Sequence, residues 1–334
     1  MKKLYVISGA TGMTGAELIK NLVSDKNNHI IGFDNFFASD IVSIEFCLGN
    51  NNLEFYELDL TKRHDLEKVQ TLVSSQKQAF DRLIYINCAA VVHTEHFYKV
   101  NATFDTNVLG MKSFLEQAVA ENAYAYINCS TSEVYSMQSH KEGGVQEDDY
   151  LLMSTAEHSQ RTSYAAGKLM TEFFLRDAVM AGKILGCSIR FANVYSDREI
   201  YPKHIIPHII NSLENSDKVV LLENAKSTSR TFLHNIDSCS SIIKLLENDR
   251  ALDGSVYNVG TEEEISILEL VDMIAGKMGK KYRIEFDGAR TSDPQRRYLS
   301  TAKIRERTSW LPEITLSEGI ARCLQMRKVP TGRK

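Results

Sequence analysis

The sequence predicts an α/β protein with a doubly wound parallel sheet followed by a smaller C-terminal lobe. Short, almost continuously apolar runs such as LYVIS (4–8), HIIGFD (29–34) and AYINCS (125–130) alternate with segments of helical period. Strands that are apolar on both faces are typical of a parallel sheet covered by helices on both sides. The 334 residues are enough for one such domain with an appendage.

The regular alternation covers residues 1–170, which we expect to form the core. Beyond Arg190 the alternation of strands and helices becomes irregular. Short segments rich in His, Pro, Asn and Ser follow, such as DREIYPKHIIPHII (197–210). We therefore expect residues 171–334 to supply the remaining core elements and a smaller lobe that closes over a ligand.

Composition and charge argue against several classes of function. The formal net charge is −4 and no basic stripe runs along the chain, so we expect no nucleic-acid partner. No stretch approaches the roughly 20 apolar residues of a membrane span, and the apolar run near the start is too short for a signal peptide. We expect a cytoplasmic protein that has no contact with membranes. The six cysteines form no C-x-x-C pair, which favours free thiols over disulfides or zinc.

A glycine-rich turn joins the first predicted strand to the first predicted helix. It has the order Gly9-Ala-Thr-Gly12-Met-Thr-Gly15 and precedes the amphipathic segment AELIKNLV. Such glycines let bare backbone N–H groups and the positive end of a helix hold a pyrophosphate. The spacing by itself is weak evidence, because the same turn can form without a ligand.

An acidic residue stands where a dinucleotide site needs one. Asp34 ends the second predicted strand, about 20 residues after the turn, where it can accept hydrogen bonds from the adenosine ribose. Its charge would repel a 2′-phosphate, and Asn35 rather than an arginine follows it. We therefore predict NAD rather than NADP. Asp59 and Leu60, at the end of LEFYELDL, are compatible with contact to the adenine edge.

A tyrosine and a lysine lie one helical turn apart. Tyr164 and Lys168 belong to YAAGKLMTEFFLRDAVMAG (164–182), and residues four apart share a face of a helix. A nearby ammonium favours the phenolate, and about 4 kcal/mol of preferential stabilisation would bring the tyrosine pKa close to neutrality. We predict that Tyr164 is a general base.

Another apolar run ends abruptly in the hydroxyls and carboxylate of STSE (130–133). Ligands of a doubly wound sheet gather at the carboxyl ends of its strands. Thr131 is then placed to hydrogen-bond the substrate hydroxyl that Tyr164 deprotonates, with Ser132 beside it. Glu133 would reach a neighbouring carbon. The alternative is a polar turn in which these side chains only cap or anchor the loop.

These motifs, taken in order, resemble the extended short-chain dehydrogenase/reductases that modify nucleotide sugars, the NAD-dependent epimerase/dehydratase family. The resemblance runs from end to end, through GATGMTG, FDNF, STSEVY, YAAGK, RFANVY, SRTFLHNID, YNVG and DPQRR. It implies a Rossmann core over residues 1–170 that binds NAD tightly, a nucleotide-sugar substrate and a homodimer. It further implies that Tyr164 removes a proton from the sugar 4-hydroxyl as hydride passes to the nicotinamide, which gives a 4-keto sugar.

The resemblance also implies sets of binding residues. The expected cofactor contacts are Gly9, Gly12, Met13, Thr14, Gly15, Asp34, Asn35, Asp59, Leu60, Ala89, Ala90, Asn107 and Lys168. The expected substrate contacts are Asn193, Arg230, Arg297 and His93. Arginine suits a diphosphate because its planar fork donates to two oxygens at once. An ordinary surface salt bridge is the alternative for Arg230.

The second step stays open between three chemistries. Epimerases of this family need little beyond Thr131, Tyr164 and Lys168, dehydratases add an acid and a base beside the threonine, and decarboxylases show T-S-E with a late arginine. Glu133 with Arg297 resembles the decarboxylases, although T-S-E also resembles GDP-mannose dehydratases. A charged base is a hazard to a simple epimerase, so Glu133 favours elimination or decarboxylation, with 4-epimerisation as the alternative.

Some segments depart from the family pattern or invite other interpretations. Met13-Thr14 and Tyr195-Ser-Asp-Arg198 replace the usual residues, and the segment around His93 and His96 matches no subgroup. His93-x-x-His96 and His204-x-x-x-His208, the latter on an expected helix, have metal-ligand spacing but no third ligand, so we predict no metal.

Two other classes of function remain. One is a non-catalytic NAD-sensing protein on the same fold, which would have no use for a Thr-Tyr-Lys set. The other is a dehydrogenase that uses free NAD on a non-nucleotide alcohol. The sequence does not indicate which sugar or nucleotide the protein takes.

Overall fold

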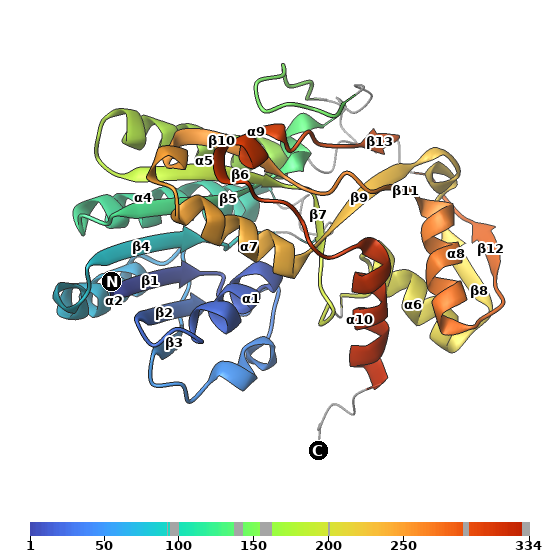
Figure 1. Cartoon of the computed structure of the whole chain (residues 1–334), viewed down its shortest axis with the longest axis horizontal. Helices are drawn as coiled ribbons and strands as arrows, with labels where there is room; N and C mark the ends of the chain where they lie inside the picture. The colour runs from blue at the N-terminus through green and yellow to red at the C-terminus, as the bar shows by residue number, and fades with distance from the viewer. Residues whose placement is uncertain are drawn as a thin grey trace.

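The computed structural model describes residues 1–91, 93, 100–136, 143–153, 162–199, 201–289 and 294–328. Within these residues a seven-stranded parallel sheet forms the centre of the molecule (Figure 1). Its strands are β1 (Lys3–Ser8), β2 (Asn28–Asp34), β3 (Leu53–Glu57), β4 (Arg82–Asn87), β5 (Ala125–Thr131), β6 (Leu185–Phe191) and β10 (Asp253–Val259). They lie in the order β10-β6-β5-β4-β1-β2-β3, which reverses between β1 and β4. The sheet is therefore doubly wound, and the predicted fold class is confirmed.

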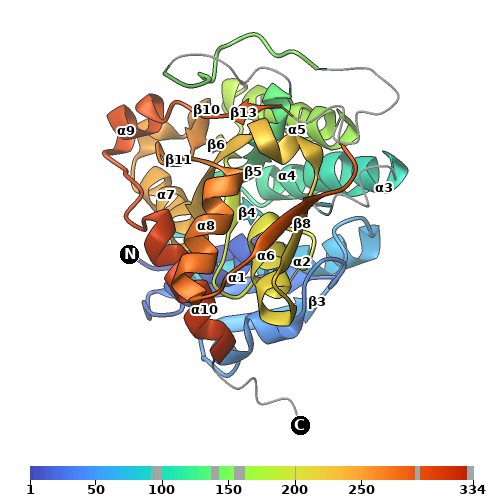
Figure 2. The ribbon, with the colours of Figure 1, turned by 90° about the vertical axis from the view of Figure 1, so that its right-hand side faces the viewer.

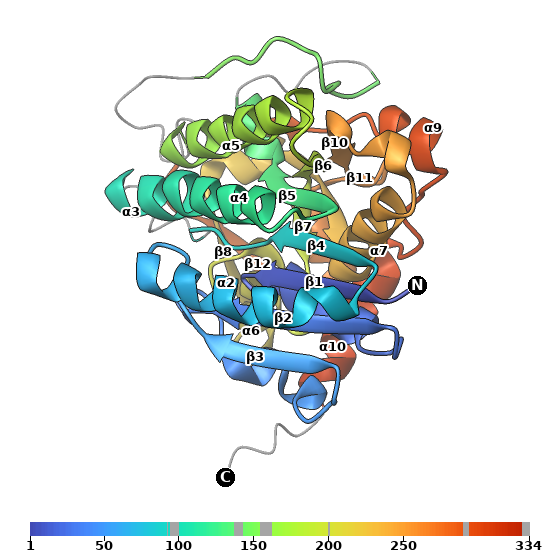
Figure 3. The ribbon, with the colours of Figure 1, turned by 90° about the vertical axis from the view of Figure 1, so that its left-hand side faces the viewer.

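Helices cover both faces of this sheet, as Figure 3 shows. Alternate side chains of a strand point to opposite faces. Leu4 and Val6 of β1 accordingly join the core beneath α2, α4 and α5, whereas Tyr5 and Ile7 join the core beneath α1, α7 and α9. The helices are α1 (Met13–Leu22), α2 (Arg63–Gln76), α3 (Val100–Phe104), α4 (Met111–Ala120), α5 (Thr162–Met180), α7 (Asn235–Leu246) and α9 (Ala302–Thr308).

The later part of the chain builds a lobe beside the carboxyl ends of the sheet (Figure 2). In it β9 pairs with β7, β11 and β13, β8 pairs with β12, and the helices pack over a hydrophobic core of their own. Local sequence fixes one helix clearly, because Ser266 and Glu269 form a capping box and Gly279 ends the helix in the left-handed region. These elements are β7 (Asn193–Tyr195), α6 (Ile205–Asn215), β8 (Lys218–Leu221), β9 (Ser229–His234), β11 (Glu264–Ser266), α8 (Ile267–Met278), β12 (Arg283–Phe286), β13 (Arg296–Arg297) and α10 (Leu316–Lys328).

The cysteines have the state that their spacing predicts. All six lie in the described part of the chain and are free, and five of them are buried. Cys88 directly follows β4 and Cys129 lies in the adjacent strand β5, and their sulfur atoms are 3.7 Å apart. Among the described helices, none has the length and apolar character needed to cross a bilayer.

The glycine-rich turn between β1 and α1 is shaped by two close approaches. Gly9 has φ +68°, and a Cβ atom there would lie 2.5 Å from the backbone nitrogen of Ala89. A Cβ atom on Gly15 would lie 2.2 Å from the carbonyl oxygen of Gly9, well inside contact distance. Only glycine lets α1 begin this close to the end of β1.

We predict that Gly15→Ala lowers the free energy of unfolding by about 1–3 kcal/mol, because the added methyl group must displace backbone atoms. Gly276 is the matched control, since it lies inside α8 with nothing within 4 Å of the position of its Cβ atom. Gly276→Ala should instead raise stability by about 0.5–1 kcal/mol. Urea denaturation measures both variants. Equal effects of the two substitutions would contradict this explanation of the turn.

Candidate active site

The turn leaves the first backbone N–H groups of α1 available to a ligand. Gly12 is the N-cap of this helix, no side chain among the described residues caps it, and its first turn carries no acid. The first N–H groups of a helix have no partner within it and carry a partial positive charge. The structure therefore offers backbone donors from Met13, Thr14 and Gly15 to an anion at the carboxyl end of β1.

Asp34 ends β2 in a fixed orientation. Its carboxylate accepts hydrogen bonds from the backbone N–H groups of Thr11 at 3.1 Å and Phe36 at 2.9 Å. The next side chain is also fixed, because the Asn35 Oδ1 atom accepts from the N–H group of Phe37 at 3.1 Å. Each carboxylate oxygen can accept a further hydrogen bond. The residues present thus fit the pyrophosphate and ribose of NAD.

β3 ends at Glu57, two residues before Asp59. Asp59 instead starts a turn, where its Oδ1 atom accepts from the N–H and hydroxyl groups of Thr61. Burial acts to raise the pKa of the Asp59 carboxyl, but hydrogen bonds from Thr61 and Asn35 outweigh it and lower the pKa. The neighbouring Leu60 is buried. The adenine contact of these two residues stays a prediction.

The loop after β4 is held by a buried asparagine. Asn107 lies in a π-helical turn (Asp105–Gly110), and its Oδ1 atom accepts from the N–H group of Val91 at 2.7 Å. This bond fixes the chain just after Ala89 and Ala90, beside the glycine-rich turn. The Nδ2 group of Asn107 is buried with no hydrogen-bond partner among the described residues. A buried donor without a partner is costly, which suits a group that meets a ligand.

His93 packs against the lobe. Its ring stacks on Tyr201 with centroids 3.9 Å apart and an interplanar angle of 8°. The structure thus brings the loop after β4 against the segment that precedes α6. His96, the other histidine of that pair, lies outside the described residues.

Tyr164 and Lys168 occupy the first two turns of α5, and both are buried. The Lys168 ammonium donates to the backbone oxygen of Cys129 at 2.8 Å, which fixes it to β5 two residues before Thr131. Burial lowers the pKa of Lys168 to about 8, although the thiols of Cys129 and Cys88 and the carboxylate of Glu172 oppose the shift. The structure therefore places a lysine with a lowered pKa beside the strand end and one turn from the tyrosine.

The hydroxyl and carboxylate groups at the end of β5 have distinct environments. The Thr131 hydroxyl accepts a hydrogen bond from the N–H group of Glu133 at 3.2 Å and caps the short 3₁₀ helix η6 (Ser132–Tyr135). Thr131 therefore does cap the loop, as the alternative interpretation of the sequence held, and this hydrogen bond fixes the direction of its side chain. Ser132 is buried. Glu133 forms an ion pair with Arg297.

Arg297 comes from far along the chain and meets Glu133 beside the end of β5. It is 4% exposed and lies in β13, and its Nη2 group has no hydrogen-bond partner among the described residues. A buried guanidinium with a spare donor is well placed to bind an anionic group. The register of β13 and β9 pairs Arg297 with Arg230, so the two arginines are neighbours.

Arg230 and Asn193 line adjacent strands of the lobe. Arg230 is buried, and its Nη1 group donates to the backbone oxygens of Ser229 at 2.7 Å and Gln295 at 3.2 Å. It is therefore not the exposed surface salt bridge that the sequence also allowed. The Asn193 amide donates to the backbone oxygen of Thr231 at 3.3 Å. Contact of these two residues with a substrate stays a prediction.

The sequence-based interpretation overlooked a buried acid and its partner. Glu172 and Arg190 form an ion pair at 2.7 Å beneath the end of β5. A signal was present, because Glu172 follows Lys168 by four residues and so shares its helical face.

The second histidine pair, His204 and His208, was expected to lie on one helix, but only His208 does. α6 starts at Ile205, so His204 is its N-cap and has extended backbone. His204 pairs with Glu199, whereas His208 meets the backbone oxygen of Val220 at 2.7 Å. Within the described ranges, no group of three or more His, Cys, Asp or Glu side chains could hold a metal.

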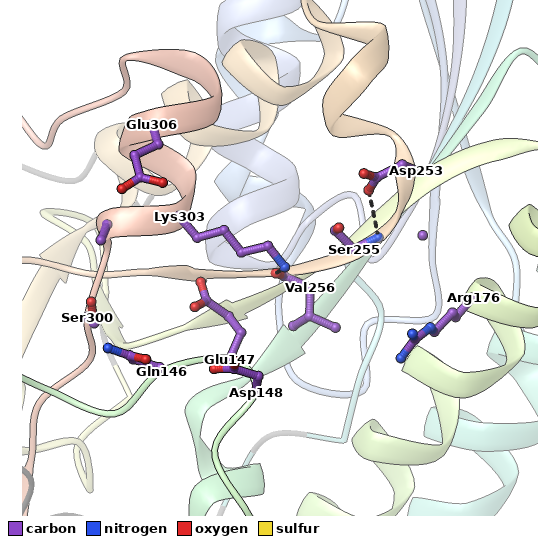
Figure 4. Close-up of a pocket in the computed structure, with 12 residues that line it drawn as sticks. Gln146, Glu147, Asp148, Arg176, Asp253, Ser255, Val256, Ser300, Lys303 and Glu306 are labelled. Carbon is purple, nitrogen blue, oxygen red and sulfur yellow. Dashed lines mark hydrogen bonds between the residues drawn. The ribbon is translucent and has the colours of Figure 1, made fainter.

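A cavity of about 510 Å³ lies elsewhere, beside the edge strand β10 (Figure 4). Its lining mixes the charges of Glu147, Arg176, Asp253 and Lys303 and includes none of the predicted site residues. The predicted catalytic residues therefore do not belong to this cavity.

The sheet, the glycine-rich turn and Asp34 define a dinucleotide-binding protein. Comparison with protein families narrows this class to a single family. The model of the NAD dependent epimerase/dehydratase family matches residues 5–260. The chain belongs to this family. The expected family is thereby confirmed.

Individual relatives perform different reactions. The chain is 29% identical over 279 residues to dTDP-D-glucose 4,6-dehydratase of Dictyostelium discoideum, a match that covers 80% of this chain and 61% of that protein. It is 25% identical over 321 residues to UDP-glucuronic acid decarboxylase 1 of Arabidopsis thaliana, with 95% and 68% covered. Among solved structures, UDP-glucuronic acid 4-epimerase from Bacillus cereus superposes with a TM-score of 0.83 at 22% identity, with 97% and 99% covered.

We predict that Lys168 titrates near pH 8, because burial disfavours its charged form. The ammonium is then progressively lost as the pH rises through this value, whereas an unperturbed lysine stays charged up to about pH 10. NMR titration of ¹³C-labelled lysine side chains measures the midpoint, and Lys168→Arg identifies the signal by removing it. A midpoint near that of an unperturbed lysine would contradict the prediction.

Proposed function

We propose that this protein is an NAD-dependent lyase that oxidises a nucleotide hexuronate at C4 and then decarboxylates it. The observation that carries the proposal is the ion pair between Glu133 and the buried Arg297 beside Thr131. A 4-epimerase of a neutral hexose has no use for a buried arginine and a carboxylate at this point, whereas a sugar carboxylate needs a cationic partner. The decarboxylase relative from Arabidopsis supports this choice.

The first half-reaction uses the groups on α5 and β5. Tyr164 takes the proton of the sugar 4-hydroxyl, Lys168 stabilises the phenolate, and Thr131 holds the same hydroxyl by a hydrogen bond. NAD, when bound, accepts the C4 hydride and thereby supplies the oxidising power. Asp34 would hold the ribose of this NAD, and the backbone N–H groups at the start of α1 would hold its pyrophosphate.

The second half-reaction follows from the product of the first. A 4-keto hexuronate is a β-keto acid, so the bond between C5 and C6 can break, CO₂ leaves, and the electron pair remains as an enolate on C4 and C5. Arg297 orients the carboxylate through its spare Nη2 donor. The enolate takes up one proton from solvent at C5, and Tyr164 returns its proton to the C4 oxygen. Bound NAD would take up and give back one hydride over the two half-reactions, so no net NADH is expected.

Dehydration across C5 and C6 is the second candidate. Glu133 would remove the C5 proton, and water would leave from C6. The Dictyostelium dehydratase, the relative with 29% identity, favours this alternative. Epimerisation of a neutral hexose at C4 would require neither Glu133 nor Arg297.

We predict that the NAD-bound protein converts a UDP- or dTDP-linked hexuronate to a product lighter by CO₂. Mass spectrometry of incubations with UDP-, dTDP-, GDP- and CDP-sugars measures this directly. Loss of the mass of water from a neutral hexose would instead support the dehydratase alternative, and an unchanged mass with a new retention time would support epimerisation. Tyr164→Phe should retain NAD and abolish every one of these conversions. Full activity of that variant would refute the proposed mechanism.

We further propose that the protein works as a cytoplasmic homodimer through an apolar surface on α3, the following π-helical turn and α5. α3 and the π-helical turn both pack beside α5, and the surface consists of exposed side chains from these three elements. These are Val100, Phe104, Leu109, Met170, Phe173 and Met180. Several large exposed apolar side chains on neighbouring elements are typical of an interface.

We predict that Phe173→Glu converts the dimer to a monomer, because a carboxylate would be buried without a partner at the centre of this surface. Leu311→Glu is the matched control, since Leu311 is equally exposed, at 54%, but lies outside the surface. Size-exclusion chromatography with light scattering measures the mass of each variant. A wild-type monomer, or a dimer that survives Phe173→Glu, would contradict the interface.

A further inference from the structure

A buried carboxylate joins the catalytic helix to the catalytic strand. Glu172 lies on α5 one turn beyond Lys168 and is 3% exposed. Its Oε1 atom accepts a hydrogen bond from the hydroxyl of Ser130 at 2.5 Å and another from the Nε group of Arg190 at 3.0 Å. Its Oε2 atom accepts from the Nη2 group of Arg190 at 2.7 Å. The carboxylate is therefore held by two strands, β5 and β6.

Arg190 extends the contact to the segment that follows Thr131. Its Nη1 group donates to the hydroxyl of Tyr135 at 2.9 Å and to the backbone oxygen of Glu147 at 3.1 Å. The Tyr135 hydroxyl in turn donates to Asn258 at 2.7 Å. One connected set of buried groups thus fixes both ends of the short stretch that contains Thr131 and Glu133.

The charge of Arg190 strongly favours the arrangement in which its guanidinium stays paired with the Glu172 carboxylate. Burial acts to lower the pKa of Arg190, but the hydrogen bonds and charge of Glu172 outweigh it and raise the pKa. Arg190 thus stays charged in the interior beside the Glu172 carboxylate, where an ion pair is stable only with close to ideal geometry and full hydrogen bonding. A displacement of Glu172 or of the strand end would leave a buried charge without its partner.

We propose that Glu172 is a positioning residue that sets the Thr131 hydroxyl against Tyr164 through its hydrogen bond to Ser130. Ser130 directly precedes Thr131, and Glu172 is on the same helix as Tyr164 and Lys168. The contact therefore fixes the distance between the two halves of the predicted proton-transfer site without touching substrate. This inference rests on the proposed function, which makes Thr131 and Tyr164 the reacting pair.

The hydrogen bond between Ser130 and Glu172 is not needed merely to pack α5 against β5. The amide of Asn128, two residues earlier on β5, already donates to Thr171 of α5 at 2.8 Å and to Ser188 of β6 at 3.1 Å. Those bonds join the same three elements farther from the strand end. What the Ser130–Glu172 bond adds is a constraint next to Thr131.

The test compares two serine substitutions in the NAD-bound full chain. Ser130→Ala removes the hydrogen bond to Glu172 and leaves the ion pair with Arg190 intact. Ser188→Ala removes an equally buried serine hydroxyl, which contacts Asn128 on the adjacent strand. Ser130→Thr keeps a hydroxyl and serves as the rescue. The measurements are kcat and KM on the nucleotide sugar that the wild type converts, and amide hydrogen exchange of residues 129–135.

Positioning predicts a specific difference between these variants. Ser130→Ala should lower kcat about tenfold or more with little change in KM, because misplacing a catalytic group by a fraction of an ångström has effects of this order. It should also speed exchange at residues 129–135. Ser188→Ala should do neither, and Ser130→Thr should restore most of kcat.

Equal losses of kcat in the two alanine variants would overturn the proposal and leave Glu172 with a purely structural role. Unchanged exchange at residues 129–135 in Ser130→Ala would overturn it as well. The exchange measurement uses no substrate. If the wild type converts none of the nucleotide sugars, the proposed function fails, while exchange still decides whether Glu172 fixes the strand end.

Discussion

The attachment of α5 to the carboxyl end of β5 is the constraint on which the candidate site depends. Lys168 donates to the backbone oxygen of Cys129, and Glu172 accepts from Ser130. Two side chains of α5 thus form hydrogen bonds with the carboxyl end of β5. Both charges are buried, and each would lose its compensation if the helix rotated or slid. Tyr164 is carried by the same helix, and Thr131 by the same strand. The contacts of Lys168 and Glu172 with β5 therefore set the relative position of these two predicted catalytic residues.

The parallel sheet brings the remaining parts of the site to the same edge. Because its strands point one way, the glycine-rich turn, Asp34, the loop after β4 and Thr131 all lie at carboxyl ends. The lobe then supplies Arg297 from far along the chain to pair with Glu133. The cofactor half of the site is thus built from local turns, whereas the proposed substrate half needs both the sheet and the lobe.

The sequence predicted best what depends on local geometry. The strand–turn–helix around Gly9, the position of Asp34 and the helical spacing of Tyr164 and Lys168 are all set by residues close in sequence. It predicted the ends of elements less well, because short-range side-chain contacts end an element before the sequence pattern does. β3 ends at Glu57, before the turn that Asp59 makes with Thr61, and α6 begins after His204, which pairs with Glu199. The pairing of Glu172 with Arg190 joins elements whose contact no local spacing reveals, although the place of Glu172 on the face of Lys168 was visible.

A crystal structure of the chain with NAD and UDP-glucuronic acid tests the central claim most directly. The claim is that α5 and β5 together hold one phenol and one hydroxyl over the reacting carbon. The account predicts that the hydroxyls of Tyr164 and Thr131 both lie within hydrogen-bond distance of the sugar 4-oxygen, with the Lys168 ammonium still bonded to the oxygen of Cys129. A Tyr164 hydroxyl turned away from the dinucleotide, or a sugar 4-oxygen bound by other side chains, would contradict it.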